Sequence, residues 1–160
     1  SNMKRNIRIL LSILLALVLT GCSRIHDYQN SLYGDDAKIA SQGDSYTFRE
    51  RLGSVKGNTL DLTFSGFYGK QSIWKIDAVE DGSIDLDIKI TMKSGKFKLC
   101  LVDSKNNVSV ITEGAGIKKL PVAILKGRSY LVVVGNNTSG VVNASVINTG
   151  SAVVQAVPME

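Results

Sequence analysis

The chain has 160 residues, of which 44% are hydrophobic and 21% charged, and its formal net charge is +5. This length is sufficient for one domain with a substantial core. A nucleic-acid-binding protein gathers its basic residues on one face, whereas here Lys and Arg are scattered among Asp and Glu. The composition therefore argues against a nucleic-acid partner.

The N-terminal residues have the pattern of a secretory signal. A basic segment, 3–8, precedes an apolar run from Ile9 to Leu19. This run is too short to span a bilayer, which needs roughly 20 apolar residues, but it fits the central region of a signal peptide. Ser1 and Asn2 precede the expected start at Met3 and are interpreted as the remnant of an expression tag.

The apolar run is followed directly by Leu19-Thr20-Gly21-Cys22, which resembles the lipobox of bacterial lipoprotein signal peptides. The resemblance implies cleavage between Gly21 and Cys22 and attachment of a diacylglyceryl group to the Cys22 thiol. Two acyl chains anchor a protein stably, at about 0.8 kcal/mol per buried methylene. We expect a protein anchored to the cell membrane or outer membrane and facing away from the cytoplasm. The alternatives are an ordinary cleaved signal that ends in cysteine and a short uncleaved anchor.

Treating residues 1–21 as tag and signal peptide changes the charge and the cysteine count. The remaining chain has 16 basic and 14 acidic residues, a net charge of +2. Lipidation of Cys22 would leave Cys100 without a disulfide partner. Because Cys100 lies in the apolar stretch 97–102, we predict a buried thiol that packs as a small hydrophobe. The densest basic segment, Lys93 to Lys98, is predicted to be a solvated turn, with a patch for phosphate groups as the alternative.

After Cys22 the pattern changes from polar to alternating. Residues 22–43 are polar with few aliphatic side chains, and we predict a flexible tether there. Residues 44–160 alternate apolar and polar positions, most cleanly at 84–90, with glycine-containing turns every 10 to 20 residues. This pattern predicts an all-β domain, a jelly-roll-like sandwich of two antiparallel sheets with about eight strands. A small β-barrel is the alternative, and Pro121 predicts an edge strand at 120–124.

The segment from Leu125 to Val146 carries a further resemblance. An aromatic residue, alternating aliphatics, the turn-like stretch Gly135 to Gly140 and a second aliphatic run follow one another. This order resembles the closing hairpin of secreted bacterial β-sandwich modules of the pre-peptidase C-terminal and carbohydrate-binding types. The resemblance implies a fold, and a fold does not by itself carry a function.

Few residues have the spacing of a catalytic or metal site. His26 is the only histidine, and a base on a mobile tether is poorly held against a nucleophile. One histidine and one free cysteine do not make a zinc site. Asp85 and Asp87 share a strand face about 7 Å apart, which suits an inverting glycosidase pair, but any alternating acidic strand gives this spacing. Asp77, Glu80 and Asp81, near a predicted hairpin, are candidate calcium ligands.

Aromatic side chains are the remaining candidates for binding. Flat rings stack on the apolar faces of sugars, and the candidate rings are Tyr46, Phe48, Phe67, Tyr68, Trp74 and Tyr130. We select Tyr68 and Trp74 as ligand-binding candidates, although the apolar neighbours of Trp74 favour a place in the core. The sequence thus predicts a non-catalytic binding or structural module with an envelope glycan or protein as partner. The alternatives are a carbohydrate-binding module with exposed aromatics and a small envelope hydrolase with paired carboxylates.

Overall fold

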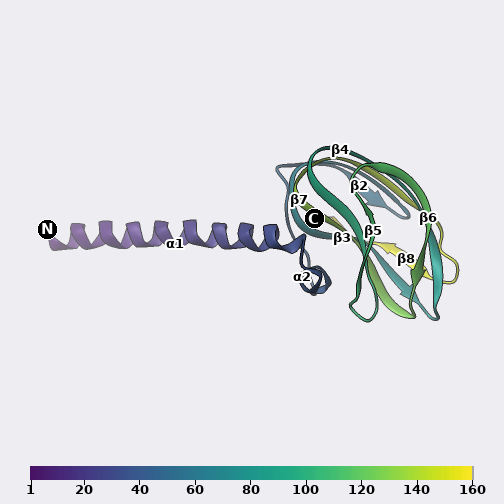
Figure 1. Cartoon of the computed structure of the whole chain (residues 1–160). Coiled ribbons are helices and arrows are strands. Elements are labelled where there is room, and N and C mark those ends of the chain that lie inside the picture. The colour runs from purple at the N-terminus through teal and green to yellow at the C-terminus, as the bar shows by residue number, and fades with distance from the viewer. Residues whose placement is uncertain (160) are drawn as a thin grey trace.

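The computed structural model of the chain describes residues 1–159, except for the side chains of 14–23. A long helix, α1 (Asn2–Leu32), projects away from a β domain, and a short helix, α2 (Asp36–Ala40), lies against that domain (Figure 1). No helix within the described residues is long and apolar enough to cross a membrane. The Cys22 side chain lies outside the described residues, so its lipidation stays a prediction.

The domain is an antiparallel β-sandwich that does not close into a barrel, which confirms the predicted fold class. Its strands pair only antiparallel. Their bounds are β1 (Ser45–Thr47), β2 (Glu50–Lys56), β3 (Thr59–Ala78), β4 (Gly82–Val102), β5 (Val108–Glu113), β6 (Gly116–Ile124), β7 (Gly127–Asn148) and β8 (Val153–Ala156). Pro121 lies in β6, which pairs only with β4, so the predicted edge position is confirmed.

Three long strands, β3, β4 and β7, form the centre of both layers. The first layer contains β2, residues 59–64, 140–148 and 82–92, and β6. The second contains β1 and β8, residues 67–78, 127–135 and 96–102, and β5. The strands pass between layers where their register shifts, around 64–67, 92–96 and 135–140. We call this side of the sandwich the bend end and the opposite side, with the turns at 79–81, 103–107 and 125–126, the loop end.

The predicted turns at Ser94-Gly95 and at Gly135–Gly140 are therefore wrong. Each lies inside a continuous strand, so the predicted closing hairpin is a single bent strand, β7. A bulge and a turn need the same residues, because both place the backbone at positive φ. Gly95 has φ 73° and Asn137 has φ 46°, and a Cβ on Gly95 would overlap the Asn137 carbonyl oxygen of the neighbouring strand. Composition alone does not separate the two structures.

The core lies between the two layers and is formed by the alternating aliphatic positions of the three long strands. Trp74 is fully buried there, and its indole Nε1 donates to the Gly57 carbonyl oxygen at 2.8 Å. Phe64, Phe67 and Phe97 fill the core at the bend end, where the rings of Phe67 and Phe48 stack at 4.4 Å. Burial of large side chains at this point stabilises the bend, because each ring contributes roughly 1.5–3 kcal/mol of apolar transfer free energy.

Candidate functional site

The outer face of the second layer is apolar and is covered by the N-terminal segment. Cys100, Val102, Val132 and Val134 point outward from β4 and β7, and they pack against Leu32, Tyr33 and Ile39. The predicted flexible tether is wrong for residues 29–41, because these apolar side chains are buried on the sheet. The boundary between Gly21 and Cys22 stays a prediction. Cys100 is a free, buried thiol, as predicted.

Lys98 holds the end of α1 on this face. Its side chain is 8% exposed, and its Nζ donates to the Tyr33 carbonyl oxygen at 2.7 Å and lies 4.5 Å from the centre of the Tyr33 ring. The Tyr33 hydroxyl in turn donates to Glu113 Oε1 at 2.7 Å. Burial and the Glu113 carboxylate both raise the pKa of Tyr33. The prediction of a solvated turn at 93–98 is thus wrong for Lys98, which belongs to a strand.

Lys70 holds the end of α2 on the same face of the sheet. Its side chain is 4% exposed, and Nζ donates to the carbonyl oxygens of Ile39 at 3.0 Å and Ser41 at 2.6 Å. Carbonyl groups at the end of a helix have no partner within the helix, so the ammonium group satisfies them. Burial lowers the pKa of Lys70, and the nearby Asp44 carboxylate opposes that shift.

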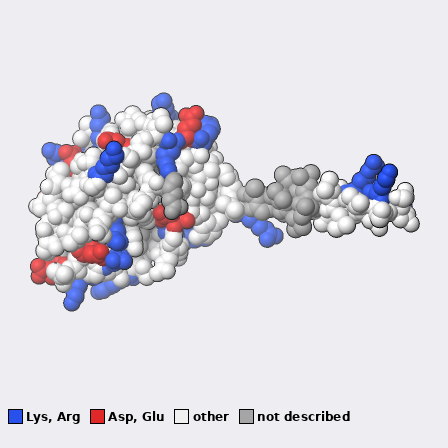
Figure 2. All heavy atoms as spheres, turned by 180° about the vertical axis from the view of Figure 1, so that it is seen from behind, with Lys and Arg blue, Asp and Glu red and all other residues white. Residues whose placement is uncertain are grey.

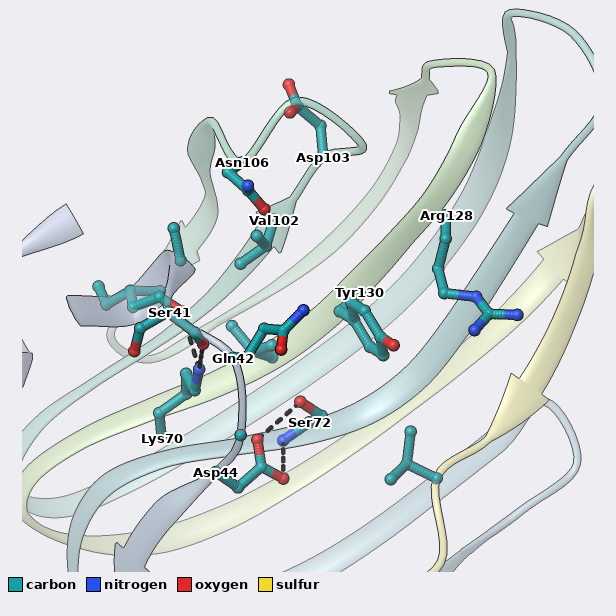
Figure 3. A pocket seen from close by; sticks show the side chains of 15 residues that line it. Ser41, Gln42, Asp44, Lys70, Ser72, Val102, Asp103, Asn106, Arg128 and Tyr130 are labelled. Carbon is teal, nitrogen blue, oxygen red and sulfur yellow. Dashed lines mark hydrogen bonds between the residues drawn. The ribbon is translucent and has the colours of Figure 1, made fainter. Parts of the chain in front are cut away.

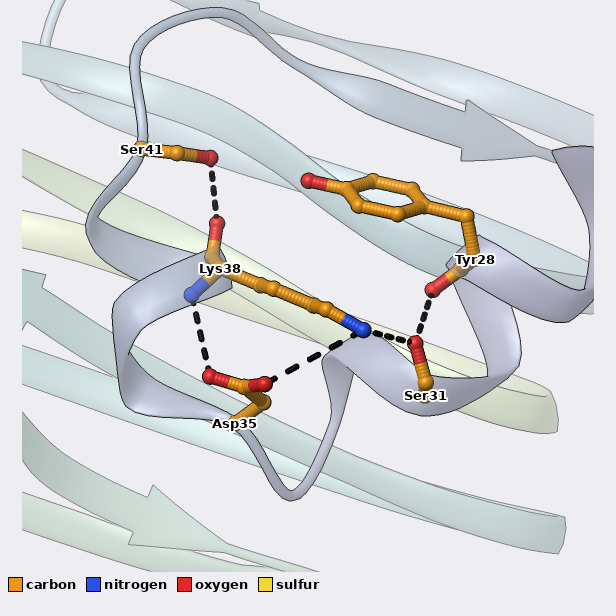
Figure 4. A network of polar contacts seen from close by, with 5 residues as sticks. All are labelled: Tyr28, Ser31, Asp35, Lys38 and Ser41. Carbon is orange, nitrogen blue, oxygen red and sulfur yellow. Dashed lines mark hydrogen bonds and ion pairs between the residues drawn. The ribbon is translucent and has the colours of Figure 1, made fainter.

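Polar contacts near the end of α1 and between the two helices complete the attachment. Gln29 is buried and accepts a hydrogen bond from Thr47 Oγ1 at 2.8 Å. Lys38 of α2 donates to Ser31 Oγ of α1 at 2.6 Å and lies 3.9 Å from the Asp35 carboxylate (Figure 4). Residues 29–41 are therefore a folded part of the domain, which we call the helical cover.

A pocket of 620 Å³ lies beside the helical cover, on the outer face of the second layer (Figure 3). One wall is the loop after α2, and the other is the turn between β4 and β5. The floor comes from β3 and β7. The lining mixes polar and apolar residues, and it is formed by Ile39, Ala40, Ser41, Gln42, Gly43, Asp44, Lys70, Ser72, Val102, Asp103, Asn106, Arg128, Tyr130, Val132 and Val157.

The pocket combines one aromatic ring with several planar polar groups. Figure 3 shows Tyr130 in the middle of the floor, with Gln42 on the cover side and Arg128 further along the same strand. Arg128 is held in place by Asp77, to which its Nε donates at 2.7 Å and its Nη2 at 3.2 Å. This contact lowers the pKa of Asp77.

The two carboxylates of the pocket have structural partners. Asp44 accepts hydrogen bonds from the backbone N–H of Ser72 at 2.9 Å and from its hydroxyl at 2.7 Å. Asp103 accepts from the backbone N–H groups of Lys105 and Asn107 at 2.8 and 2.9 Å. Burial opposes the shift, but these hydrogen bonds lower the pKa of Asp103. A general acid needs a raised pKa, so the environment of Asp103 does not favour that role.

The aromatic pair predicted to bind a ligand is not brought together. Trp74 is inside the core, so its selection as a binding residue is wrong. Tyr68 is half-buried, and its ring lies 4.6 Å from that of His26 in α1, outside the pocket. Of the six candidate rings, Tyr130 is the one that lines the pocket.

Two of the three predicted calcium ligands have other partners. Asp77 binds Arg128, and Asp81 Oδ1 accepts a hydrogen bond from the Lys126 backbone N–H at 2.7 Å. Among the described residues, no group of three metal-ligating side chains is gathered. The calcium site on Asp77, Glu80 and Asp81 therefore stays a prediction.

Asp85 and Asp87 lie on the first layer and do not line the 620 Å³ pocket. Asp85 accepts from Asn148 Nδ2 at 3.4 Å, and Asp87 lies 3.8 Å from Lys119 Nζ. Sequence reasoning missed Gln42 and Asn106, since loop residues carry no periodicity. The turn composition around Asn106 was the available signal, because it indicated a loop, and loops often carry binding residues.

No protein-family model matches the chain, and no curated protein sequence is similar to it. Among solved structures, it is similar to a CBM35 from Paenibacillus barcinonensis, at 17% identity over 63% of this chain and 91% of that one, with a TM-score of 0.36. It is also similar to a Xyl-CBM35 in complex with a glucuronic acid containing disaccharide, at 13% identity over 74% and 84% of the two chains and a TM-score of 0.38. A third is CBM35 from Cellvibrio japonicus Abf62, at 13% identity over 73% and 83% and a TM-score of 0.34.

Replacing Lys98 by Met tests the attachment of the helical cover. The substitution keeps the apolar stem but leaves the buried Tyr33 carbonyl without its donor, at a cost of about 1–3 kcal/mol. We expect amide hydrogen exchange in residues 29–33, at the end of α1, to rise about tenfold or more, while the core strands keep their protection. Lys96→Met, at an exposed position two residues away, is the control and should leave the exchange unchanged. Equal exchange in both variants would contradict the role of Lys98.

The raised pKa of the Cys100 thiol predicts that the free energy of unfolding falls at alkaline pH. Burial raises its pKa from 9.0 to about 11, so the unfolded chain releases this proton first. Stability from the neutral thiol is complete below pH 9 and is lost as the pH rises toward 11. We expect the unfolding free energy of Cys100→Ala to fall less steeply than that of the unmodified chain across this window. Urea unfolding at intervals of half a pH unit measures this, and parallel curves would count against it.

Proposed function

We propose that this chain is a non-catalytic binding module of the cell envelope, anchored by a diacylglyceryl group on Cys22, and that its pocket binds a glycan. The observation that carries the glycan proposal is the lining of the 620 Å³ pocket: Tyr130, the amides of Gln42 and Asn106, and the guanidinium of Arg128. A sugar presents an apolar C–H face and rows of hydroxyl groups. An aromatic ring suits the first, and planar donors and acceptors suit the second.

The carboxylates of the pocket already accept hydrogen bonds from the protein, and this favours a binding role over hydrolysis. Asp44 and Asp103 already accept two hydrogen bonds each from the protein. The Arg128 guanidinium is oriented by Asp77 but keeps further N–H donors for a ligand. A preformed pocket with oriented polar groups binds without a large ordering cost.

Binding to a glycan array tests the pocket. The double variant Gln42→Ala with Tyr130→Ala removes the ring and one amide, each worth roughly 0.5–1.5 kcal/mol. We therefore expect affinity for the best glycan to fall about tenfold or more. Tyr68→Ala with Gln155→Ala removes the same two side-chain types outside the pocket and should leave binding intact. Glycan binding that survives in the pocket variant would rule out this site.

Mass spectrometry and cell fractionation test the anchor. Chain purified from membranes should begin at Cys22 and carry the mass of a diacylglyceryl thioether, as the lipobox resemblance implies. Cys22→Ala should lose this mass and leave the membrane fraction that the lipidated chain occupies, because the two acyl chains supply the stable anchoring. An unmodified Cys22 in the membrane-bound chain would contradict the anchor. It would not bear on the glycan site, which the glycan array tests separately.

A further inference from the structure

The chain enters the domain at its bend end. The His26 ring of α1 packs on Tyr68, which directly follows the point where β3 bends, and Gln29 is bonded to Thr47 of β1. Figure 1 shows α1 projecting away from the sandwich beyond these contacts. The direction from the domain toward Cys22 is thus set by contacts with the bend end.

The connection between the proposed anchor and the domain is short. Gln29, the first residue of the helical cover, comes seven residues after Cys22. This stretch spans about 10 Å as a helix and at most about 25 Å fully extended. Lipidation of Cys22, on which this step rests, would therefore hold the bend end close to the bilayer surface.

Figure 2 shows basic and acidic side chains spread over the face of the domain that it presents, and exposed basic residues are also present at the bend end. Arg49 and Lys93 line a groove of 400 Å³, Lys96 follows on the same bend, and Arg24 lies on α1. None of them takes part in the ion pairs found within the described residues. The acids nearby are Glu50, in the groove, Asp27, on α1, and Glu113, which accepts the hydrogen bond from the Tyr33 hydroxyl.

The groove also offers hydroxyl groups. Ser65, Ser94 and Ser139 line it together with the two cations. Ser65 Oγ is buried and has no hydrogen-bond partner in the described part of the chain. That atom is closed off from the groove, so the groups that would bind a phosphate there are the Arg49 guanidinium and the Lys93 ammonium, which neutralise its charge.

We infer that the bend end lies on the membrane and binds the phosphate groups of anionic lipids through Arg49, Lys93 and Lys96. Anionic headgroups attract Lys and Arg within about 8 Å at physiological salt, and the short connection keeps these residues within reach. The loop end, whose acids Glu80, Asp81 and Asp103 are accompanied by Lys56, Lys105 and Lys126, faces away from the bilayer. The anchor and this contact together fix the orientation of the domain.

Energy transfer from a fluorophore on the domain to a headgroup-labelled lipid tests this orientation. The lipidated chain, confirmed by mass, is reconstituted into vesicles of phosphatidylcholine alone or mixed with phosphatidylglycerol. The label is placed by Ala115→Cys, in the exposed turn near the bend end, since Cys100 is buried and Cys22 carries the lipid. We expect higher energy transfer in the anionic vesicles. This increase should be lost at 1 M salt, because the Debye length is then only about 3 Å and the attraction between the basic residues and the headgroups is screened.

Charge reversal of Arg49, Lys93 and Lys96 to Glu should abolish the increase. The matched control reverses Lys56, Lys105 and Lys126, three exposed lysines near the loop end, and should leave the increase intact. A label at Val79→Cys, near the loop end, should respond less to the anionic lipid. If energy transfer in the lipidated chain does not depend on headgroup charge, this inference is overturned and the proposed anchor is not. A chain without the lipid mass would overturn both the proposed anchor and this inference.

Discussion

Two buried ammonium groups determine how this molecule is assembled around its sheet. Lys70 and Lys98 project from the outer face of the second layer, and each donates to backbone carbonyl groups of the N-terminal segment. A buried charge without partners costs several kcal/mol, so these lysines are stable there only while the helical cover supplies the carbonyls. The cover, in turn, needs the donors for its helix ends. The apolar contacts of Leu32 and Ile39 with the sheet are formed in the same step.

The pocket depends on this assembly. Its cover-side wall is the loop after α2, which Lys70 holds through Ser41 and which Asp44 joins to Ser72 of β3. Tyr130 on the floor is adjacent to Val132, an outward residue that the cover buries. Release of the cover would therefore expose the apolar face and remove one side of the pocket. In the proposed orientation, the bend end faces the bilayer and the loop-end side of the pocket, with Arg128 and Asn106, faces away from it.

The bends of the three long strands explain why one sheet supplies both layers. A strand that continues into the second layer needs flexibility at its midpoint, and Gly95 and Gly135 provide it. At Gly135 a Cβ would overlap the Phe67 ring, so the glycine also allows the aromatic core to pack tightly. The same glycines led to the prediction of hairpin turns. Alternation identified the strand halves correctly but did not show whether two halves belong to one strand.

Much of the architecture could be predicted from the sequence, because alternation reports which side of a strand is buried. Antiparallel pairing, the edge position of Pro121, the burial of Cys100 and the core alternative for Trp74 all follow from neighbouring residues. The helical cover did not follow, since its polar residues are stable only through partners far away in the chain, such as Lys98 for Tyr33. The pocket was missed for the same reason. Gln42, Asn106 and Tyr130 come from three separate segments, and only the tertiary structure decides which loops and strands meet.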